Sequence, residues 1–575
     1  MTKNMVKGFY RLAVITCSAF SLLMQYTSAG VRANEAVSEF DYNNFEFWEE
    51  QCRLFNNLQK YTEAIEACEK AIALKPKKKN VLLWTTRSNA LLKLEKYAEA
   101  IISYNQVLQT EPNNSFVLTQ KCQALSQMGN QKDAISECEQ ALRINGNWGN
   151  ITPATAWYNR GLALRKLTQN QAAITSFERA ILIKSDYSLA FAQKCRTLSD
   201  LKAYKDAIEV CSRAIKINGD WGESNPIIAY KYKAQALTKL GKLDKAIDNY
   251  QKILKINPND AISWYEQGKL QQKLAQYKEA LASYSMAVQV KPKFSQAASR
   301  QGEMFNKLKS YQLAIESIDK ALNGDGIWKE DTTLAYLWVQ RSTALVNLKK
   351  YEESIADAER AIALRQSYAE AWNNKAVSLW NLGKLKEAET AAIKATGFNH
   401  KYAQAWFNRG RILSYFKKYS AAVTAYETAL QGDIEKNDNA TRAMILTNKG
   451  VAFWRLKKYR QALKSIEKAT KLNQNYFAAW YNKGIVLLEL KDYKSAFRAY
   501  HRANSIYPDN YLVWTGIAMA LVGNRNYQEA LKAVDRALNI NPDYILAQKQ
   551  KEVITQMKAK LADNQIKVNQ ITKEK

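Results

Sequence analysis

The chain has 575 residues, of which 47% are hydrophobic and 24% are charged, with 84 basic and 54 acidic side chains. The resulting net charge of +30 predicts either a solvated basic exterior or attraction to an anionic partner. Only 2 histidines occur, which leaves little room for histidine chemistry, and the 8 prolines and 21 glycines form no long linker.

The first 33 residues have the organisation of a secretory signal peptide. Residues 1–11 carry three basic side chains and no acid, residues 12–24 are uncharged and mostly apolar, and small residues follow. This order predicts cleavage near residue 29 or 33, followed by a lead-in over residues 34–44. The apolar stretch is short for a membrane span. An uncleaved membrane anchor is the alternative.

From residue 45 the sequence repeats itself with a period of 34 residues. Residues 403–410 (AQAWFNRG) and 477–484 (FAAWYNKG) share an aromatic residue, a glycine and the same distance to a later Tyr-x-x-Ala. With Trp480 numbered as position 4 of its repeat, Gly484 is position 8. The same register has fourteen starts, at residues 45, 81, 115, 154, 188, 227, 261, 295, 335, 369, 403, 443, 477 and 511. Such self-similarity predicts supersecondary units stacked in a row.

Position 20 explains why the units are expected to be helix pairs. It is alanine in thirteen of the fourteen repeats, and the exception, Ser354, is also small. Two antiparallel helices approach closely only where side chains are small. The pattern W-x3-G-x2-Φ…Y-x2-A-x3-Φ-x2-A…P resembles the tetratricopeptide repeat. Over residues 45–544 the resemblance implies an all-α, right-handed superhelical solenoid of antiparallel helix pairs, in which the first helix of each repeat lines the concave face.

Six cysteines form three pairs whose partners are sixteen positions apart: Cys52 and Cys68, Cys122 and Cys138, Cys195 and Cys211. Each pair occupies positions 8 and 24, which face each other across the hairpin. A bridge would close a loop of about 15 residues, which stabilises by roughly 3 kcal/mol. With the signal segment, the pairs predict disulfides in an oxidising compartment. The alternative is reduced, buried thiols. Two thiols per hairpin fall short of a four-ligand metal site.

Some repeats carry five or six extra residues, and tryptophans recur in or beside these inserts. INGNWG (144–149) and INGDWG (217–222) follow the repeats that begin at 115 and 188. We expect Trp148, Trp221 and Trp328 to fill the wedge that a longer loop opens. The alternative is an exposed recognition rim.

A row of asparagines at position 6 is the first candidate for ligand binding. An amide both donates and accepts hydrogen bonds, so a ladder of amides can hold an extended peptide backbone. The row is similar to the asparagine ladder of O-linked N-acetylglucosamine transferases; the alternative is that asparagine is simply common at position 6 in the family. The residues are Asn159, Asn374, Asn408, Asn448 and Asn482, of which the last four lie in consecutive repeats.

Aromatic and arginine side chains surround the ladder and predict a ligand groove over residues 369–489, because such residues dominate binding energy at interfaces. Packing between helices is the competing explanation. The set is Phe407, Tyr481, Trp380, Tyr415, Trp454, Arg411 and Arg455. Chaperone-binding relatives use a carboxylate clamp, whose nearest counterpart here keeps two of five residues: Lys231, Gln235, Glu266, Gln296 and Arg300. Glu266 would repel a carboxylate, so no clamp is expected.

After the last repeat, residues 545–575 predict an amphipathic capping helix with a polar tail. The apolar residues Ile545, Val553, Ile554, Met557 and Leu561 have helical spacing.

The sequence as a whole predicts a binding protein and no enzyme. It contains no glycine-rich phosphate loop, metal motif or nucleophile motif, so no cofactor or metal is expected. We expect a periplasmic or secreted scaffold that binds partner peptides or proteins in its concave groove and assists assembly of an envelope or membrane complex. The alternative is a structural or adhesion protein whose basic surface binds an anionic membrane surface or polysaccharide. No nucleic-acid motif is present.

Overall fold

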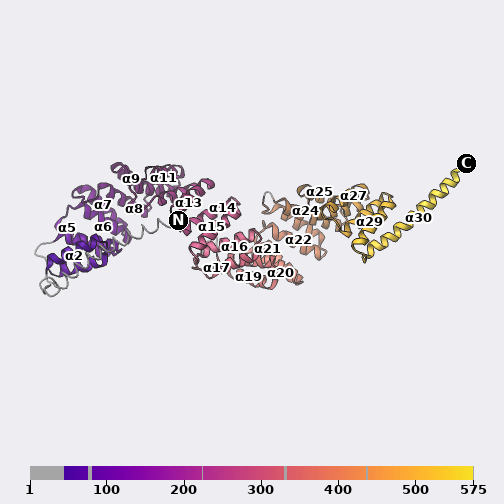
Figure 1. The fold of residues 1–575 in the computed structure, drawn as a ribbon, viewed down its shortest axis with the longest axis horizontal. Helices are drawn as coiled ribbons and strands as arrows, with labels where there is room; N and C mark the ends of the chain where they lie inside the picture. Colours follow the sequence, from indigo (N-terminus) through magenta and orange to yellow (C-terminus); the bar gives the residue numbers. More distant parts are fainter. Residues whose placement is uncertain (1–43, 75–79, 223, 329–332, 436–437, 574–575) are drawn as a thin grey trace, which may run out of the picture. The chain divides into compact units, whose positions relative to one another are not determined.

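The computed structural model describes residues 44–74, 80–222, 224–328, 333–435 and 438–573. All regular secondary structure in these residues is helical, in twenty-nine helices, α2 to α30 (Figure 1). The predicted signal segment and nearly all of the lead-in lie outside the described residues. None of the described helices combines the length and apolar character needed to cross a membrane. The chain forms two compact units, residues 1–274 and 275–575.

In the first unit, consecutive helices pack as antiparallel pairs, which confirms the predicted all-α solenoid of helix pairs. The helices are α2 (Phe45–Asn57), α3 (Tyr61–Ala73), α4 (Val81–Lys93), α5 (Tyr97–Thr110), α6 (Ser115–Met128), α7 (Gln131–Ile144), α8 (Pro153–Lys166), α9 (Asn170–Ile183), α10 (Ser188–Asp200), α11 (Tyr204–Ile217), α12 (Ile227–Lys239), α13 (Leu243–Ile256) and α14 (Ala261–Lys273).

The second unit continues the same alternation. Its helices are α15 (Tyr277–Val290), α16 (Ser295–Lys307), α17 (Tyr311–Leu322), α18 (Leu334–Asn347), α19 (Tyr351–Leu364), α20 (Ala369–Asn381), α21 (Leu385–Phe398), α22 (Ala403–Tyr415), α23 (Tyr419–Gln431), α24 (Asn439–Arg455), α25 (Tyr459–Leu472), α26 (Phe477–Glu489), α27 (Tyr493–Ile506), α28 (Tyr511–Gly523), α29 (Tyr527–Ile540) and α30 (Ile545–Lys573). Most first helices begin at the predicted start; α8 and α18 begin one residue earlier and α24 begins four residues earlier.

Most pairs pack a small residue at position 8 against a larger one at position 24. A Cβ atom added to Gly410 would lie 2.5 Å from Cε1 of Tyr426, and one added to Gly161 would lie 2.6 Å from Cε1 of Phe177. The rings therefore occupy the space that a side chain at position 8 would need. This is the contact that brings the two helices together, and the paired cysteines occupy the same two positions.

Neighbouring repeats are joined by a recurring set of polar contacts at positions 4 and 7. The indole Nε1 of Trp480 donates to the carbonyl of Gln474, six residues earlier, at 2.9 Å, and Trp372 and Trp406 repeat this bond. A basic residue at position 7 pairs with an acid on the second helix of the preceding repeat. These pairs include Arg87–Glu69, Arg160–Glu139, Lys194–Glu178, Arg341–Asp319, Lys375–Glu359, Lys449–Glu427, Lys483–Glu467 and Lys551–Asp535.

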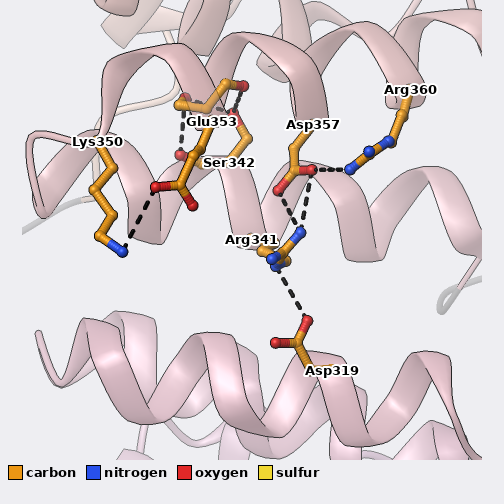
Figure 2. Close-up of polar contacts among 8 residues, drawn as sticks. Asp319, Arg341, Ser342, Lys350, Glu353, Asp357 and Arg360 are labelled. Atoms are coloured by element: carbon orange, nitrogen blue, oxygen red, sulfur yellow. Dashed lines mark hydrogen bonds and ion pairs between the residues drawn. The ribbon is translucent and has the colours of Figure 1, made fainter.

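Arg341 makes the most extensive of these contacts. Figure 2 shows its guanidinium between Asp319 on α17, at 3.1 Å, and Asp357 on α19, at 3.1 Å. Asp357 is buried and also accepts from Arg360 at 2.7 Å. Burial raises the pKa of Asp357 although both arginines oppose that effect. The network ties one repeat to the next.

The inserts return to the first helix of their own repeat and complete its N-terminus. The backbone N–H of Ala403 donates to Asp433 Oδ1 at 2.7 Å, and that of Ser295 donates to Asp325 Oδ1 at 3.3 Å. A carboxylate at this place satisfies free backbone N–H groups and opposes the positive end of the helix dipole. In the first unit, the N–H of Phe116 instead donates to the carbonyl of Asn147 at 3.0 Å.

The insert tryptophans pack against the repeats. Trp221 is 8% exposed, and Trp148 and Trp328 are half-buried. The indole Nε1 of Trp148 donates to Asn145 Oδ1 at 3.0 Å, and Trp221 makes the same bond to Asn218. These contacts favour the predicted wedge-filling role over an exposed rim.

Helix α30 occupies the place of the first helix of a further repeat and continues without a turn to Lys573. It begins at Ile545, one period after the last start, and Gln548 at position 4 donates to the carbonyl of Pro542 in the manner of the tryptophans. Ala547 and Ile554 are buried, so the expected capping contact is made by these two residues. Most of the apolar residues expected to cover the last face are exposed instead, namely Ile545, Val553, Met557 and Leu561.

Candidate binding grooves

The three cysteine pairs are placed as their register predicts. The Cα atoms lie 5.0 Å apart in Cys52–Cys68, 5.5 Å apart in Cys122–Cys138 and 5.4 Å apart in Cys195–Cys211, and the sulfurs lie at bonding distance. All six residues are buried. Each pair could therefore close a staple between the two helices of one repeat.

Of the four ladder asparagines in consecutive repeats, the first two use their amide donors within the protein. Asn374 Nδ2 donates to Thr343 Oγ1 at 2.9 Å, and Asn408 Nδ2 donates to Asn373 Oδ1 at 2.9 Å. Both side chains are buried. Because each bond reaches the preceding repeat, these two asparagines hold neighbouring first helices together.

The other two ladder asparagines turn back on their own helices. Asn448 Nδ2 donates to the carbonyl of Met444 at 2.9 Å, and Asn482 Nδ2 donates to the carbonyl of Ala478 at 2.8 Å. Both side chains are half-buried. A peptide bound along this row would therefore meet amides whose donors already have partners, so the ladder stays a prediction.

The predicted aromatic groove is brought together only in part. Arg411 lies over the rings of Trp380 and Phe407, at 5.9 and 6.0 Å. The hollow beside Trp380 and Arg411 measures only about 10 Å³. Phe407 is buried against Tyr426, so it lies behind the groove surface.

Trp454 lies apart from that cluster and stacks with Arg455, whose guanidinium is 4.6 Å from the ring. Tyr481 lines a larger hollow, of about 160 Å³. The free volume in this part of the chain therefore lies toward its C-terminal end.

We call the surface around Tyr481 the C-terminal groove. Two hollows, of about 160 and 340 Å³, share Met519 and Leu546 as lining residues. Position 9 of three successive first helices contributes Ile485, Met519 and Val553. The remaining apolar lining comes from Leu488, Leu512, Val522 and Ile554.

The C-terminal groove is apolar yet open to solvent. Met519, Leu546 and Val553 are 46%, 49% and 48% exposed. Glu489 and Lys549 lie at its edges, and burial raises the pKa of Tyr481, which keeps its phenol neutral. An apolar floor with a few polar groups at the rim is the usual construction of a protein-binding surface.

The sequence-based expectation missed this groove because α30 supplies part of it. The segment 545–575 was expected to cover the last hydrophobic face of the solenoid. The available signal was the position of the last helix: it begins one full period after residue 511, which puts Leu546 and Val553 at concave positions 2 and 9.

A second groove, in the first unit, is polar. It measures about 570 Å³, and six of its thirteen lining residues are amides, on α2, α4, α6 and the insert that follows α7; Lys93 and Glu95 are the charged residues of the lining. Three of the lining glutamines lie on one face of α6, three and four positions apart: Gln120, Gln123 and Gln127. We call this surface the amide groove. None of its residues was among the sequence-predicted site residues.

Comparisons with known proteins identify the repeats. Tetratricopeptide-repeat family models match more than half of the chain. The chain therefore belongs to the tetratricopeptide-repeat proteins, a family made up mainly of non-catalytic protein-interaction scaffolds. The matched segments are 53–78, 82–114, 154–187, 227–260, 249–282, 339–400, 403–431, 447–511 and 487–551.

Two curated relatives are similar over short segments. A tetratricopeptide repeat-containing protein of Methanocaldococcus jannaschii is 25% identical over 149 residues, which is 25% of this chain and 25% of the relative. Anaphase-promoting complex subunit 3 of Schizosaccharomyces pombe is 25% identical over 166 residues, which is 29% of this chain and 24% of the relative. The chain thus spans about a quarter of the length of these relatives.

Two solved structures are similar over most of the chain. The Cut9–Hcn1 structure of the anaphase-promoting complex is 15% identical and covers 89% of this chain and 96% of its own, with a TM-score of 0.39. The Naa15/Naa10 structure bound to HypK-THB is 13% identical and covers 95% of this chain and 97% of its own, with a TM-score of 0.33.

Among the described residues, no group of three or more histidine, cysteine, aspartate or glutamate side chains is placed to hold a metal ion.

Proposed function

We propose that this protein is a scaffold that binds an apolar segment of a partner protein in the C-terminal groove. One observation carries the proposal: Met519, Leu546 and Val553 form a continuous apolar strip that is about half exposed. Isolated exposed apolar side chains are ordinary, whereas a strip along a concave surface indicates an interaction site. The hollows beside the strip give partner side chains a place to insert.

The proposal is tested by substituting Met519 with aspartate. The groove is apolar, so a carboxylate there must be desolvated when the partner binds, and we expect affinity to fall by at least about tenfold. Leu182→Asp is the matched control, because Leu182 is exposed, apolar and located in the first unit. Partners would first be captured from the envelope fraction of the source cells, identified by mass spectrometry, and then assayed as purified proteins.

Unchanged binding by Met519→Asp, or equal loss with Leu182→Asp, would contradict the groove proposal. The salt dependence separates the alternative of a basic adhesive surface. Binding to an anionic surface should vanish at about 0.5 M salt, whereas an apolar contact should persist.

We also propose that the scaffold acts outside the cytoplasm, where it assists assembly of an envelope complex. The signal-like segment and the three cysteine pairs support this placement. Sequencing the N-terminus of the mature protein should find residue 30 or 34. Six free thiols under denaturing, non-reducing conditions would contradict the disulfides.

A further inference from the structure

A cluster of basic side chains adjoins the amide groove on the neighbouring first helices. Lys166 on α8 donates from Nζ to the carbonyl of Ser126 at 2.6 Å and lies 3.5 Å from Gln127 Oε1. Arg165 is the residue before it, and Arg196 lies on the next first helix, α10. The amides and the basic cluster therefore form one continuous surface within the first unit.

The two arginines have little negative charge to balance them. Arg165 has one ion pair, a long one of 3.8 Å from Nη1 to Asp200 Oδ2. Its Nε is buried and has no hydrogen-bond partner among the described residues. Burial, followed by the charge of Arg196, lowers the pKa of Arg165.

Arg196 has a phenol partner but no carboxylate. Its Nη1 donates to the Tyr232 hydroxyl at 3.2 Å, and its guanidinium lies 5.4 Å from the centre of that ring. No ion pair of Arg196 with an acid is found in the described part of the chain.

The second unit contains the same arrangement with the carboxylate in place. Arg300 lies 5.4 Å from the ring of Tyr336 and donates to its hydroxyl at 3.3 Å. There Glu303, three residues further on, accepts from Arg300 Nη1 at 2.7 Å. Arg196 has Ser199 three residues further on, where Arg300 has Glu303, although Arg196 is at position 9 of its repeat and Arg300 at position 6. The chain thus shows that a carboxylate fits this guanidinium–phenol pair, and it leaves that place unfilled at Arg196.

Several side-chain amides in and near the amide groove have no hydrogen bond to a described residue. Within the groove they include those of Gln120, Gln123 and Asn89. Asn159, on α8, is only 5% exposed, and its Nδ2 also has no partner. A buried amide such as that of Asn159 usually has hydrogen-bond partners, whereas the amides of Gln120, Gln123 and Asn89 are half-buried and reach solvent. Each side-chain amide has an NH2 donor and a carbonyl acceptor, which match the alternating C=O and N–H groups of a peptide backbone.

From these contacts we propose that the concave face of the first unit binds an extended acidic peptide. Arg165 and Arg196 would hold a carboxylate of the peptide, and the amides of α6 and Asn89 would hold its backbone. Adjacent first helices lie about 10 Å apart, a distance that about three residues of extended chain span. These residues differ from those of the carboxylate clamp considered above, and the site is separate from the C-terminal groove.

The test uses the full mature chain and a fluorescein-labelled Gly-Ser-Ala-Gly-Ser-Ala-Glu-Glu peptide with an amidated C-terminus. A Gln-Gln version of the peptide removes the charge and keeps the shape. By fluorescence polarisation, we expect the acidic peptide to bind at least about tenfold more tightly, because a guanidinium–carboxylate pair is charge-assisted. The double substitution Arg165→Gln with Arg196→Gln should abolish that preference.

Further variants separate the two parts of the site. Gln123→Ala should weaken both peptides by a similar factor of about three, because it removes one backbone contact. Arg300→Gln is the matched control and should leave binding unchanged, since Arg300 already has Glu303. Arg196→Lys keeps the charge but loses the planar fork, and it should retain part of the preference.

Several results would overturn the proposal. Equal binding of the two peptides by the native chain would do so, as would an unchanged preference in the double variant with native circular dichroism. If the double variant does not fold, the single variant Arg196→Gln decides the question, because its ring partner Tyr232 remains. Tight binding of a phosphoserine peptide without binding of the glutamate peptide would assign the site to phosphate instead. Met519→Asp should not affect any of these measurements, so this proposal and the proposed function fail separately.

Discussion

Replacing Gly410 with alanine should destabilise α22 and α23 although alanine is the better helix former. Alanine favours a helix over glycine by about 1 kcal/mol. Here its Cβ would lie 2.5 Å from Cε1, 2.7 Å from Cδ1 and 3.0 Å from Cζ of Tyr426. Tyr426 is only 1% exposed, so its ring has little room to move. Overpacking of this kind costs about 1–3 kcal/mol; the ring has so little room that we expect a cost near the upper end of this range, and a net loss of about 2 kcal/mol after the gain in helix propensity.

Gly397→Ala is the control for this prediction. Gly397 also lies in a helix, and an added Cβ would meet nothing within 4 Å. The substitution should therefore stabilise the protein, by up to about 1 kcal/mol. Combining Gly410→Ala with Tyr426→Leu should recover part of the loss, because the leucine lacks the ring atoms that clash. The coupling energy of the double-mutant cycle measures the contact.

Hydrogen exchange followed by mass spectrometry is the suitable assay, because stability in a solenoid is local. Exchange in residues 403–431 should accelerate in Gly410→Ala, while distant repeats keep their native rates. Urea unfolding followed by circular dichroism gives the size of the change. A variant as stable as the native chain, or a coupling energy of zero, would refute the reasoning.

Three further predictions concern the staples, the indole bonds and the inserts. Replacing Cys122 and Cys138 with serine should lower the free energy of unfolding of the first unit by about 3 kcal/mol, measured by urea unfolding without reductant; no change would argue for free thiols. Trp480→Phe should cost about 1 kcal/mol through its lost indole bond, and more than Trp514→Phe, whose Nε1 has no hydrogen bond to a described residue; equal losses would contradict that role. Burial would raise the pKa of Asp325, but hydrogen bonds, chiefly from Lys291, bring it below its ordinary value of 3.8. Its contribution to stability is therefore present above pH 3.8 and lost as the pH falls below that value, so an Asp325→Asn titration should lack that part of the acid transition.

The repeat register predicted the contacts that lie within one helix pair. Gly410 faces Tyr426, and Cys122 faces Cys138, because sixteen residues is the distance across a two-helix hairpin. These positions follow from helix geometry and need no knowledge of the neighbouring repeats. For the same reason, most predicted starts coincide with the first residue of a helix.

The repeat register did not predict the hydrogen-bond partner of each polar side chain. Asn374 and Asn408 occupy the expected position, yet their donors go to the preceding repeat. The Asp433 carboxylate caps a helix that begins thirty residues earlier. Such choices depend on the distance and orientation of the adjacent unit, which a periodic pattern leaves open.

The sequence by itself determined the architecture of this protein, because small and large residues at fixed intervals admit only one way to pack two helices. The location of free surface was decided by the tertiary structure. Residues 369–489 have the right composition for a groove, but their side chains largely fill one another's space. The open surfaces lie beside α30 and around Arg196, which has no ion pair with an acid among the described residues, whereas Arg300 pairs with Glu303. Whether a concave side chain is satisfied depends on the helix beside it, and only the folded chain brings the two together.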